Sequence, residues 1–123
     1  MRIPILKQEN FLIASIQVAL SDLELEQLRE DLNDKVGEHR SFGVIVDISS
    51  LDVMDSYATR TLRSIAYITA LRGAKTIVVG IQPDVAYSMV RLGLSLENID
   101  TALDLEDGLA ILRASLEGGA EPE

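Results

Sequence analysis

Two continuous apolar runs limit what this chain can fold into more than any other feature of its sequence. Residues 43–47 read GVIVD and residues 75–80 read KTIVVG, each centred on three consecutive Val or Ile residues. A strand that is apolar on both faces is typical of a parallel sheet with helices on both sides. The two runs therefore predict buried strands in the parallel core of an α/β domain.

The segment between the two runs has the pattern of a helix. Apolar residues recur at helical spacing from Ser56 to Leu71, and Gly73 is placed to end the helix in the left-handed conformation. The apolar face of this helix is predicted to hold Leu62, Ile65, Ala66, Ile68 and Leu71. A strand-helix-strand unit therefore forms the middle of the chain.

The N-terminal part is predicted to add a hairpin and a helix. Residues 3–7 and 11–17 are short apolar runs separated by Gln8-Glu9-Asn10, which suits two strands joined by a tight turn. Ser21 and Glu24 then have the spacing of a capping box. One apolar stripe follows, made of Leu25, Leu28, Leu32 and Val36. His39, at the far end of this helix, is interpreted as a surface residue.

The C-terminal part continues the alternation of helices and strands. Pro83 is expected to begin a short helix that Gly93 ends, and residues 99–103 supply a last brief strand. A final helix begins at residues 104–107. The two helices are predicted to bury Val85, Ala86, Met89 and Val90, and Leu105, Leu109, Leu112 and Leu116. We predict one α/β domain over residues 1–117, with a mixed sheet, and a flexible tail at residues 118–123.

Charge and composition exclude several classes of function. The net charge of −9 repels phosphate backbones and anionic membranes, so neither nucleic acid nor a membrane is expected as a partner. The chain has no cysteine and one histidine, which excludes thiolate metal sites and imidazole clusters. No apolar stretch approaches the ~20 residues of a membrane-spanning helix, and the start lacks a signal-peptide pattern. We expect a cytoplasmic protein.

Several carboxylates gather in DISSLDVMDS, the segment between the first buried strand and the next helix. This segment holds Asp47, Asp52, Asp55 and Ser56. In open α/β sheets, sites form where the carboxyl ends of strands meet the N-termini of helices. A purely structural interpretation is also open, because either Asp55 or Ser56 can accept a hydrogen bond from the first turn of the helix.

Most catalytic interpretations of this segment lack necessary parts. A serine hydrolase needs a base near its hydroxyl, whereas His39 lies on another helix and no G-x-S-x-G turn occurs. Neither common glycine-rich nucleotide loop is present. Three aspartates can in principle hold Mg²⁺, but each has a simpler capping or solvated role, so no metal is expected. A receiver-like phosphoacceptor at Asp47 is a weaker alternative, because the acidic pair that holds magnesium in receivers is missing.

The run VIVDISSLDVMDSYATRTL resembles the signature of STAS domains, in which an apolar strand ends in D-[ILV]-[ST] and D-[ST] opens a helix. GAKTIVVGIQPDVAYSMVRLGL is similar to stressosome members of the family, and the similarity extends to IPILK and IDTALDLEDGLAIL. It covers nearly the whole chain and implies a single STAS domain of the RsbS-type stressosome branch.

The resemblance implies a phosphoacceptor at Ser56, directly after Asp55. Sporulation-type antagonists have glycine two residues after the acceptor, whereas this chain has Ala58, as the stressosome branch permits. A second acceptor at Ser88 is a further expectation, although a buried or capping serine is the favoured description of that residue. Ser56 phosphate would be opposed by the nearby Asp52 and Asp55. Arg60, four residues on, lies on the same helical side and is expected to pair with it.

The resemblance also implies a non-enzymatic binding and scaffold protein without a cofactor of its own. Its expected partners are an RsbT-type serine kinase, RsbR-type STAS paralogues and a PP2C-type phosphatase, within a homo-oligomer or mixed assembly. ATP would belong to the kinase. The alternative is a simple anti-sigma-factor antagonist without higher assembly. Met1, Ile3, Ile5, Phe11 and Ile13 are expected to form either an exposed apolar patch or an ordinary core hairpin.

Overall fold

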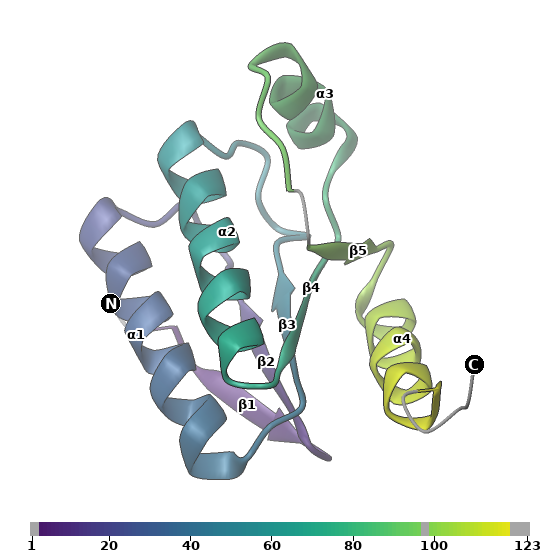
Figure 1. The fold of residues 1–123 in the computed structure, drawn as a ribbon. Coiled ribbons are helices and arrows are strands. Elements are labelled where there is room, and N and C mark those ends of the chain that lie inside the picture. Colours follow the sequence, from purple (N-terminus) through teal and green to yellow (C-terminus); the bar gives the residue numbers. More distant parts are fainter. Residues whose placement is uncertain (1–2, 97–98, 119–123) are drawn as a thin grey trace.

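Five strands form one mixed sheet in a computed structural model that describes residues 3–96 and 99–118. The strands are β1 (Ile5–Gln8), β2 (Phe11–Ser15), β3 (Gly43–Asp47), β4 (Lys75–Val79) and β5 (Asp100–Ala102). They lie in the sheet in sequence order, so each strand pairs with the strand that precedes it (Figure 1). β1 is antiparallel to β2, and all later pairs are parallel.

The predicted hairpin and the predicted parallel core are both confirmed. The hairpin strands span residues 5–8 and 11–15, slightly offset from the expected 3–7 and 11–17. In the parallel part, Ile45 lies between Ile13 and Ile77 in register. The two apolar runs of the sequence are therefore adjacent strands at the centre of the sheet.

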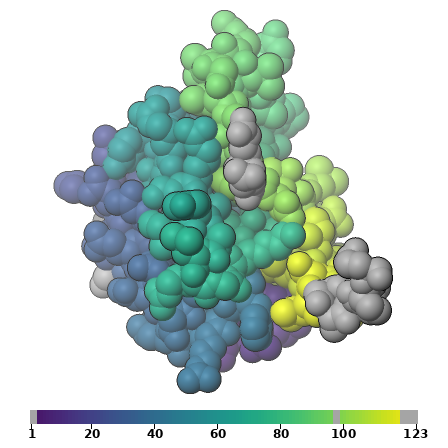
Figure 2. All heavy atoms as spheres, viewed as in Figure 1, coloured from purple at the N-terminus to yellow at the C-terminus, as the bar shows by residue number. Residues whose placement is uncertain are grey.

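Four helices cover the two faces of the sheet. They are α1 (Asp22–His39), α2 (Ser56–Leu71), α3 (Pro83–Arg91) and α4 (Leu105–Gly118). α1 and α2 lie side by side and form a continuous surface over one face, whereas α4 lies on the other (Figures 1 and 2). α3 projects beyond the edge of the sheet at which β3 and β4 end (Figure 1).

Local signals explain where the helices begin. The capping box of α1 is present: the Ser21 hydroxyl accepts a hydrogen bond from the Glu24 N–H at 3.2 Å, and the Glu24 carboxylate accepts one from the Ser21 N–H at 2.9 Å. Pro83 occupies the first position of α3. The predicted bounds of α2 are the observed ones, and Gly73 follows with a positive φ of 87°.

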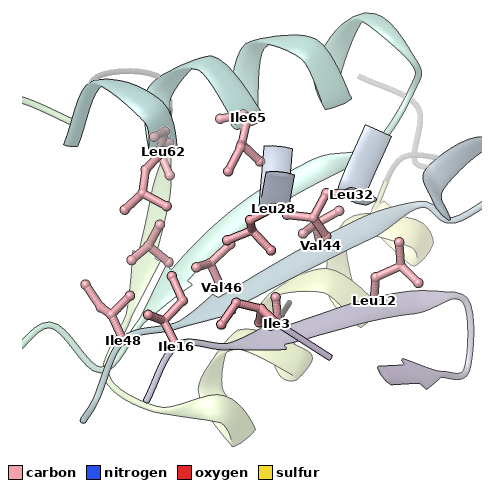
Figure 3. Packing of buried hydrophobic residues seen from close by; sticks show 14 of the residues in the cluster. Ile3, Leu12, Ile16, Leu28, Leu32, Val44, Val46, Ile48, Leu62 and Ile65 are labelled. Carbon is pink, nitrogen blue, oxygen red and sulfur yellow. The ribbon is translucent and has the colours of Figure 1, made fainter. Parts of the chain in front are cut away.

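The larger part of the core lies between the sheet and the pair α1 and α2. Leu28 and Leu32 of α1 and Leu62 and Ile65 of α2 point toward the sheet (Figure 3). They meet the side chains on one face of the central strands, Leu12, Val44 and Val46 (Figure 3). All four predicted residues of the α1 stripe are buried.

The second face of the sheet is covered by α4. Leu109 and Leu112 pack there against five strand residues, which are Phe11, Ile13, Ile45, Ile77 and Val79. A Cβ atom on Gly108 would lie 2.8 Å from a methyl carbon of Val79, so the absence of a side chain allows α4 to approach the sheet closely. Because both faces are covered, β3 and β4 are apolar on both sides.

Some predicted core positions are wrong. Leu71 and Val90 are 72% and 77% exposed, and Ala86 is exposed as well. α3 buries only Val85 and Met89, because it projects beyond the sheet edge and meets the core along a narrow stripe. Leu116 is 43% exposed, in the last turns of α4.

The hairpin is part of the core and does not form an exposed apolar patch. Ile3, Phe11 and Ile13 are 7%, 1% and 5% exposed. Ile5 is partly buried and packs on the same core, and Met1 lies outside the described residues. Of the predicted tail, Gly118 is the last residue of α4, and residues 119–123 lie outside the described residues.

Candidate functional site

The candidate site is built on the loop that connects β3 to α2, at the carboxyl edge of the sheet. Ile48, Leu51 and Met54 are buried and hold the loop to the core. Between them, Ser49, Ser50, Asp52 and Val53 are exposed. The loop is therefore anchored by apolar residues along its length, while its polar side chains face solvent.

Hydrogen bonds fix this loop to the two neighbouring loops. The Asp47 carboxylate accepts hydrogen bonds from the backbone N–H and the hydroxyl of Ser49, at 2.9 and 2.7 Å. The Ser49 carbonyl accepts one from the Gln82 side-chain amide at 2.6 Å. The Ser50 hydroxyl donates to the Gln17 side chain at 3.2 Å. Asp47 therefore shapes the turn after β3.

A close backbone approach adds to this arrangement. Gly80, directly after β4, has a φ of 77° and lies against Ser49. A Cβ atom at Gly80 would be 2.6 Å from the Ser49 Cβ and 2.9 Å from its Cα. Only glycine fits this position without displacing the loop.

Asp55 and Ser56 occupy different positions at the start of α2. Asp55 is the N-cap, and its carboxylate accepts a hydrogen bond from the Ala58 N–H at 2.8 Å. Ser56 is the first residue of the helix and is half-buried. Among the described residues its hydroxyl has no hydrogen-bond partner, so the cap is supplied by Asp55 and the Ser56 hydroxyl is left unengaged.

The charged residues predicted to surround Ser56 are exposed. Asp52 lies in the loop before the helix, and Arg60 lies one turn after Ser56. Neither side chain forms an ion pair or hydrogen bond within the described part of the chain. Arg63, one turn further, donates to the Ser95 carbonyl at 3.1 Å and so ties α2 to the segment after α3.

Tyr57 connects the start of α2 to α1. Its hydroxyl donates to the Glu26 carboxylate at 2.8 Å. This hydrogen bond, with partial burial and the negative charge of Glu26, raises the pKa of Tyr57 above its ordinary value of 10.0. The negative charge of Asp22 also raises this pKa, so the side of α1 that faces the start of α2 carries two carboxylates.

Ser88 is placed differently from the prediction. It is exposed, and it is the sixth residue of the nine-residue helix α3. The N-cap of that helix is Gln82, so the description of Ser88 as a buried or capping serine is wrong. Its side chain faces outward because Val85 and Met89 occupy the buried stripe.

One feature of the site was missed from the sequence. A pocket of about 100 Å³ opens between the start of α1 and the start of α2. We call it the apolar pocket; its walls include Ile16, Leu20, Leu25, Leu51, Met54 and Leu62. Apolar residues in the segments before α1 and α2, where surface loops are usually polar, are the signal that would have indicated it. Figure 3 shows Ile16 and Leu62 at one end of the core cluster.

Within the described residues, no group of three or more His, Asp or Glu side chains is arranged to hold a metal ion. None of the helices within residues 3–96 and 99–118 is both long and apolar enough to cross a membrane.

The fold and the site define a class of protein: a single mixed-sheet α/β domain in which an aspartate cap and a hydroxyl residue open the helix after the central strand. The family model of the STAS domain matches residues 2–108, and the chain belongs to that family. The resemblance inferred from the strand and loop motifs is thereby confirmed.

The relatives point to the stressosome branch. The chain is 28% identical over 101 residues to the RsbT co-antagonist protein RsbRA of Bacillus subtilis. The aligned region covers 82% of this chain but only 37% of that protein. A serine-to-glutamate variant of RsbS from Moorella thermoacetica has a TM-score of 0.81 and 32% identity, over 94% of this chain and 97% of that one. A chain of the stressosome, a signal integration and transduction hub, has a TM-score of 0.76 and 33% identity, over 92% and 98%.

Proposed function

We propose that this chain is a phosphorylation-controlled stressosome scaffold and binding protein, with no catalytic activity of its own. In the unmodified state it sequesters an RsbT-type serine kinase, and phosphorylation of Ser56 by that kinase releases it. The observation that carries the proposal is the Ser56 hydroxyl. It lies at the first position of α2, half-buried, and no described residue engages it.

The fold can accept a phosphate at this position. The free N–H groups of the first helical turn and the positive end of the helix dipole favour an anion there. Asp55 keeps its capping hydrogen bond to Ala58, so modification of Ser56 leaves the cap in place. Arg60 lies one turn along on the same helical side and is exposed, which makes it available to pair with the phosphate.

Release follows from like charge at the interface. A serine can accept phosphate from ATP only when it lies next to the nucleotide in the kinase. After transfer, a group of about −1.5 to −2 charge on Ser56 faces the remaining nucleotide phosphates in the kinase. Such juxtaposition costs several kcal/mol, and about 1.4 kcal/mol corresponds to a tenfold loss of affinity.

The relatives support the wider setting. RsbRA is named a co-antagonist of RsbT, and a chain of the stressosome has a similar fold at 33% identity. We infer that this chain assembles with RsbR-type paralogues in the cytoplasm, that it self-associates or co-assembles, and that a PP2C-type phosphatase restores Ser56. ATP is bound by the kinase and not by this chain.

The test is phosphorylation of the purified chain by an RsbT-type kinase with ATP, followed by intact mass measurement. The wild-type chain should gain one phosphate and then lose affinity for the kinase, whereas Ser56→Ala should gain none. Ser50→Ala, which alters an exposed serine of the same loop, and Ser88→Ala are the matched controls and should behave as wild type. An unchanged gain of phosphate in Ser56→Ala overturns the assignment.

A further inference from the structure

The apolar pocket is too small for an ordinary small-molecule ligand. Its volume of about 100 Å³ is well below the ~300 to 1,000 Å³ of typical ligand sites. It is closer to the ~150 Å³ cavity that holds one benzene molecule. The size therefore fits a single apolar side chain.

The walls and the rim of the pocket have different characters. Leu25, Leu51 and Leu62 are 3%, 7% and 2% exposed and form apolar walls. Val53 lines the same pocket and is 62% exposed, so an apolar surface continues outward from it. An apolar side chain inserted into the pocket would leave water and contact these walls, which favours binding.

The polar surroundings of the pocket are acidic. Asp55 is the one polar residue among those that line it, and its carboxylate is exposed. On the side of α1, Glu26 and Asp22 both raise the pKa of Tyr57, the residue two positions after Asp55. A partner that enters the pocket therefore meets carboxylates and is favoured if it carries a lysine or arginine beside its apolar side chain.

The pocket and Ser56 lie close together at the start of α2. Asp55, Ala58 and Leu62 line the pocket and so mark one side of the helix. Ser56 faces another side with Arg60 and Arg63, at steps of four and three residues, but it directly follows Asp55. A protein whose active site reaches Ser56 therefore comes next to the rim of the pocket at Asp55.

We propose that the apolar pocket is an anchor site for the kinase, which inserts one aliphatic side chain flanked by a basic residue next to Asp55. This inference deepens the proposed function and rests on it. The anchor supplies affinity independently of the hydroxyl of Ser56. The phosphate on Ser56 then repels the nucleotide phosphates of the kinase beside the anchor site. It releases the kinase without entering the apolar pocket.

The test is the affinity of unphosphorylated variants for an RsbT-type kinase, measured by titration without nucleotide. Ala58→Met places a longer side chain in the pocket, and Val53→Ser removes apolar surface from its exposed rim. Each should weaken binding, Ala58→Met by about 10- to 100-fold, the equivalent of one buried aliphatic side chain. Ala110→Met, on an exposed alanine of α4, is the matched control and should bind as wild type.

Asp55→Asn tests the charge separately, because asparagine caps a helix as well as aspartate does. It should weaken binding by a few-fold and reduce its salt dependence. Unchanged affinity in both Ala58→Met and Val53→Ser overturns the anchor site. In that case the proposed function still stands if Ser56→Ala gains no phosphate from the kinase. Weakened binding in both, with phosphate still gained by Ser56→Ala, supports the anchor and overturns the acceptor. No binding of the wild-type chain overturns both.

Discussion

Asp55 and Ser56 illustrate at the residue scale how neighbours in a sequence receive different roles. Both side chains are able to cap a helix, and the sequence left the choice open. The structure places Asp55 at the N-cap, with its carboxylate 2.8 Å from the Ala58 nitrogen, and Ser56 inside the first turn. The cap is thus separate from the hydroxyl that we propose as the acceptor.

Replacement of Asp55 should separate its capping role from its charge. Asp55→Ala removes the acceptor of the Ala58 N–H and should lower the free energy of unfolding by about 1 kcal/mol. Asp55→Asn should leave it nearly unchanged. Urea denaturation of both variants measures the difference, and equal losses in the two would contradict a capping role.

Substitutions of Gly80 and Gly93 test the close approach of Gly80 to Ser49 in the loop of the site. Gly80→Ala should lower the free energy of unfolding by about 2 to 4 kcal/mol, because a positive φ and a contact of 2.6 Å to the Ser49 Cβ both oppose a methyl group. Gly93→Ala is the matched control: φ is 68°, but nothing lies within 4 Å of the added carbon. Its loss should be about 1 kcal/mol.

Urea denaturation again supplies the values. If both variants lose the same stability, backbone strain alone explains the glycine and the contact with Ser49 contributes nothing. A larger loss in Gly80→Ala, accompanied by slower phosphorylation of Ser56, would show that the contact also positions the loop of the site.

At the scale of elements, α4 is held to the sheet by an ion pair as well as by its leucines. The Glu9 carboxylate, in the turn between β1 and β2, accepts hydrogen bonds from Arg113 Nε at 3.2 Å and Nη2 at 2.5 Å. This hydrogen bonding, together with the positive charge of Arg113, lowers the pKa of Glu9 below its ordinary 4.5. The first hairpin and the last helix are thereby joined across 104 positions of sequence.

The ion pair predicts a pH-dependent difference between the wild-type chain and Glu9→Gln. Because the pKa of Glu9 is lower in the folded chain, the pair stabilises the fold above about pH 4.5 and loses this effect as the pH falls through the lowered pKa. The variant should therefore be less stable at pH 7, with the gap closing toward pH 3. Urea titrations at both pH values measure it, with the exposed Glu30→Gln as control; a constant gap would contradict the pairing.

The leucines of α4 should matter more than its exposed end. Leu112 is 1% exposed and lies over Gly43 of β3, whereas Leu116 is 43% exposed. Leu112→Ala should lower the free energy of unfolding by about 2 to 5 kcal/mol, and Leu116→Ala by less than about 1 kcal/mol. Denaturation of the two variants by urea compares them, and similar losses would mean that α4 contributes little to covering its face of the sheet.

At the scale of the whole molecule, the proposed scaffold function and the alternative of a simple antagonist predict particles of different size. A stressosome scaffold should self-associate or co-assemble with RsbR-type paralogues, whereas a simple anti-sigma-factor antagonist should stay small. Light scattering of the chain alone and mixed with such a paralogue measures this. A monomer of 13.5 kDa in both samples would contradict the scaffold and leave the simple antagonist.

The sequence by itself determined the order of the elements and the parallel core. Runs such as GVIVD carry their burial in their own composition, and caps such as Ser21-Glu24 are local, so both can be recognised without a partner segment. Membership in the STAS family followed from the same local motifs.

Only the tertiary structure decided which apolar residues of the helices are buried and what surrounds Ser56. Leu71 and Val90 are apolar, yet they are exposed because they face away from the buried sides of their helices, which Ala66 and Thr69 mark in α2 and Val85 and Met89 mark in α3. The apolar pocket and the contact of Gly80 with Ser49 join segments that are far apart along the chain. Such features depend on how loops meet at one edge of the sheet, and no local pattern encodes that meeting.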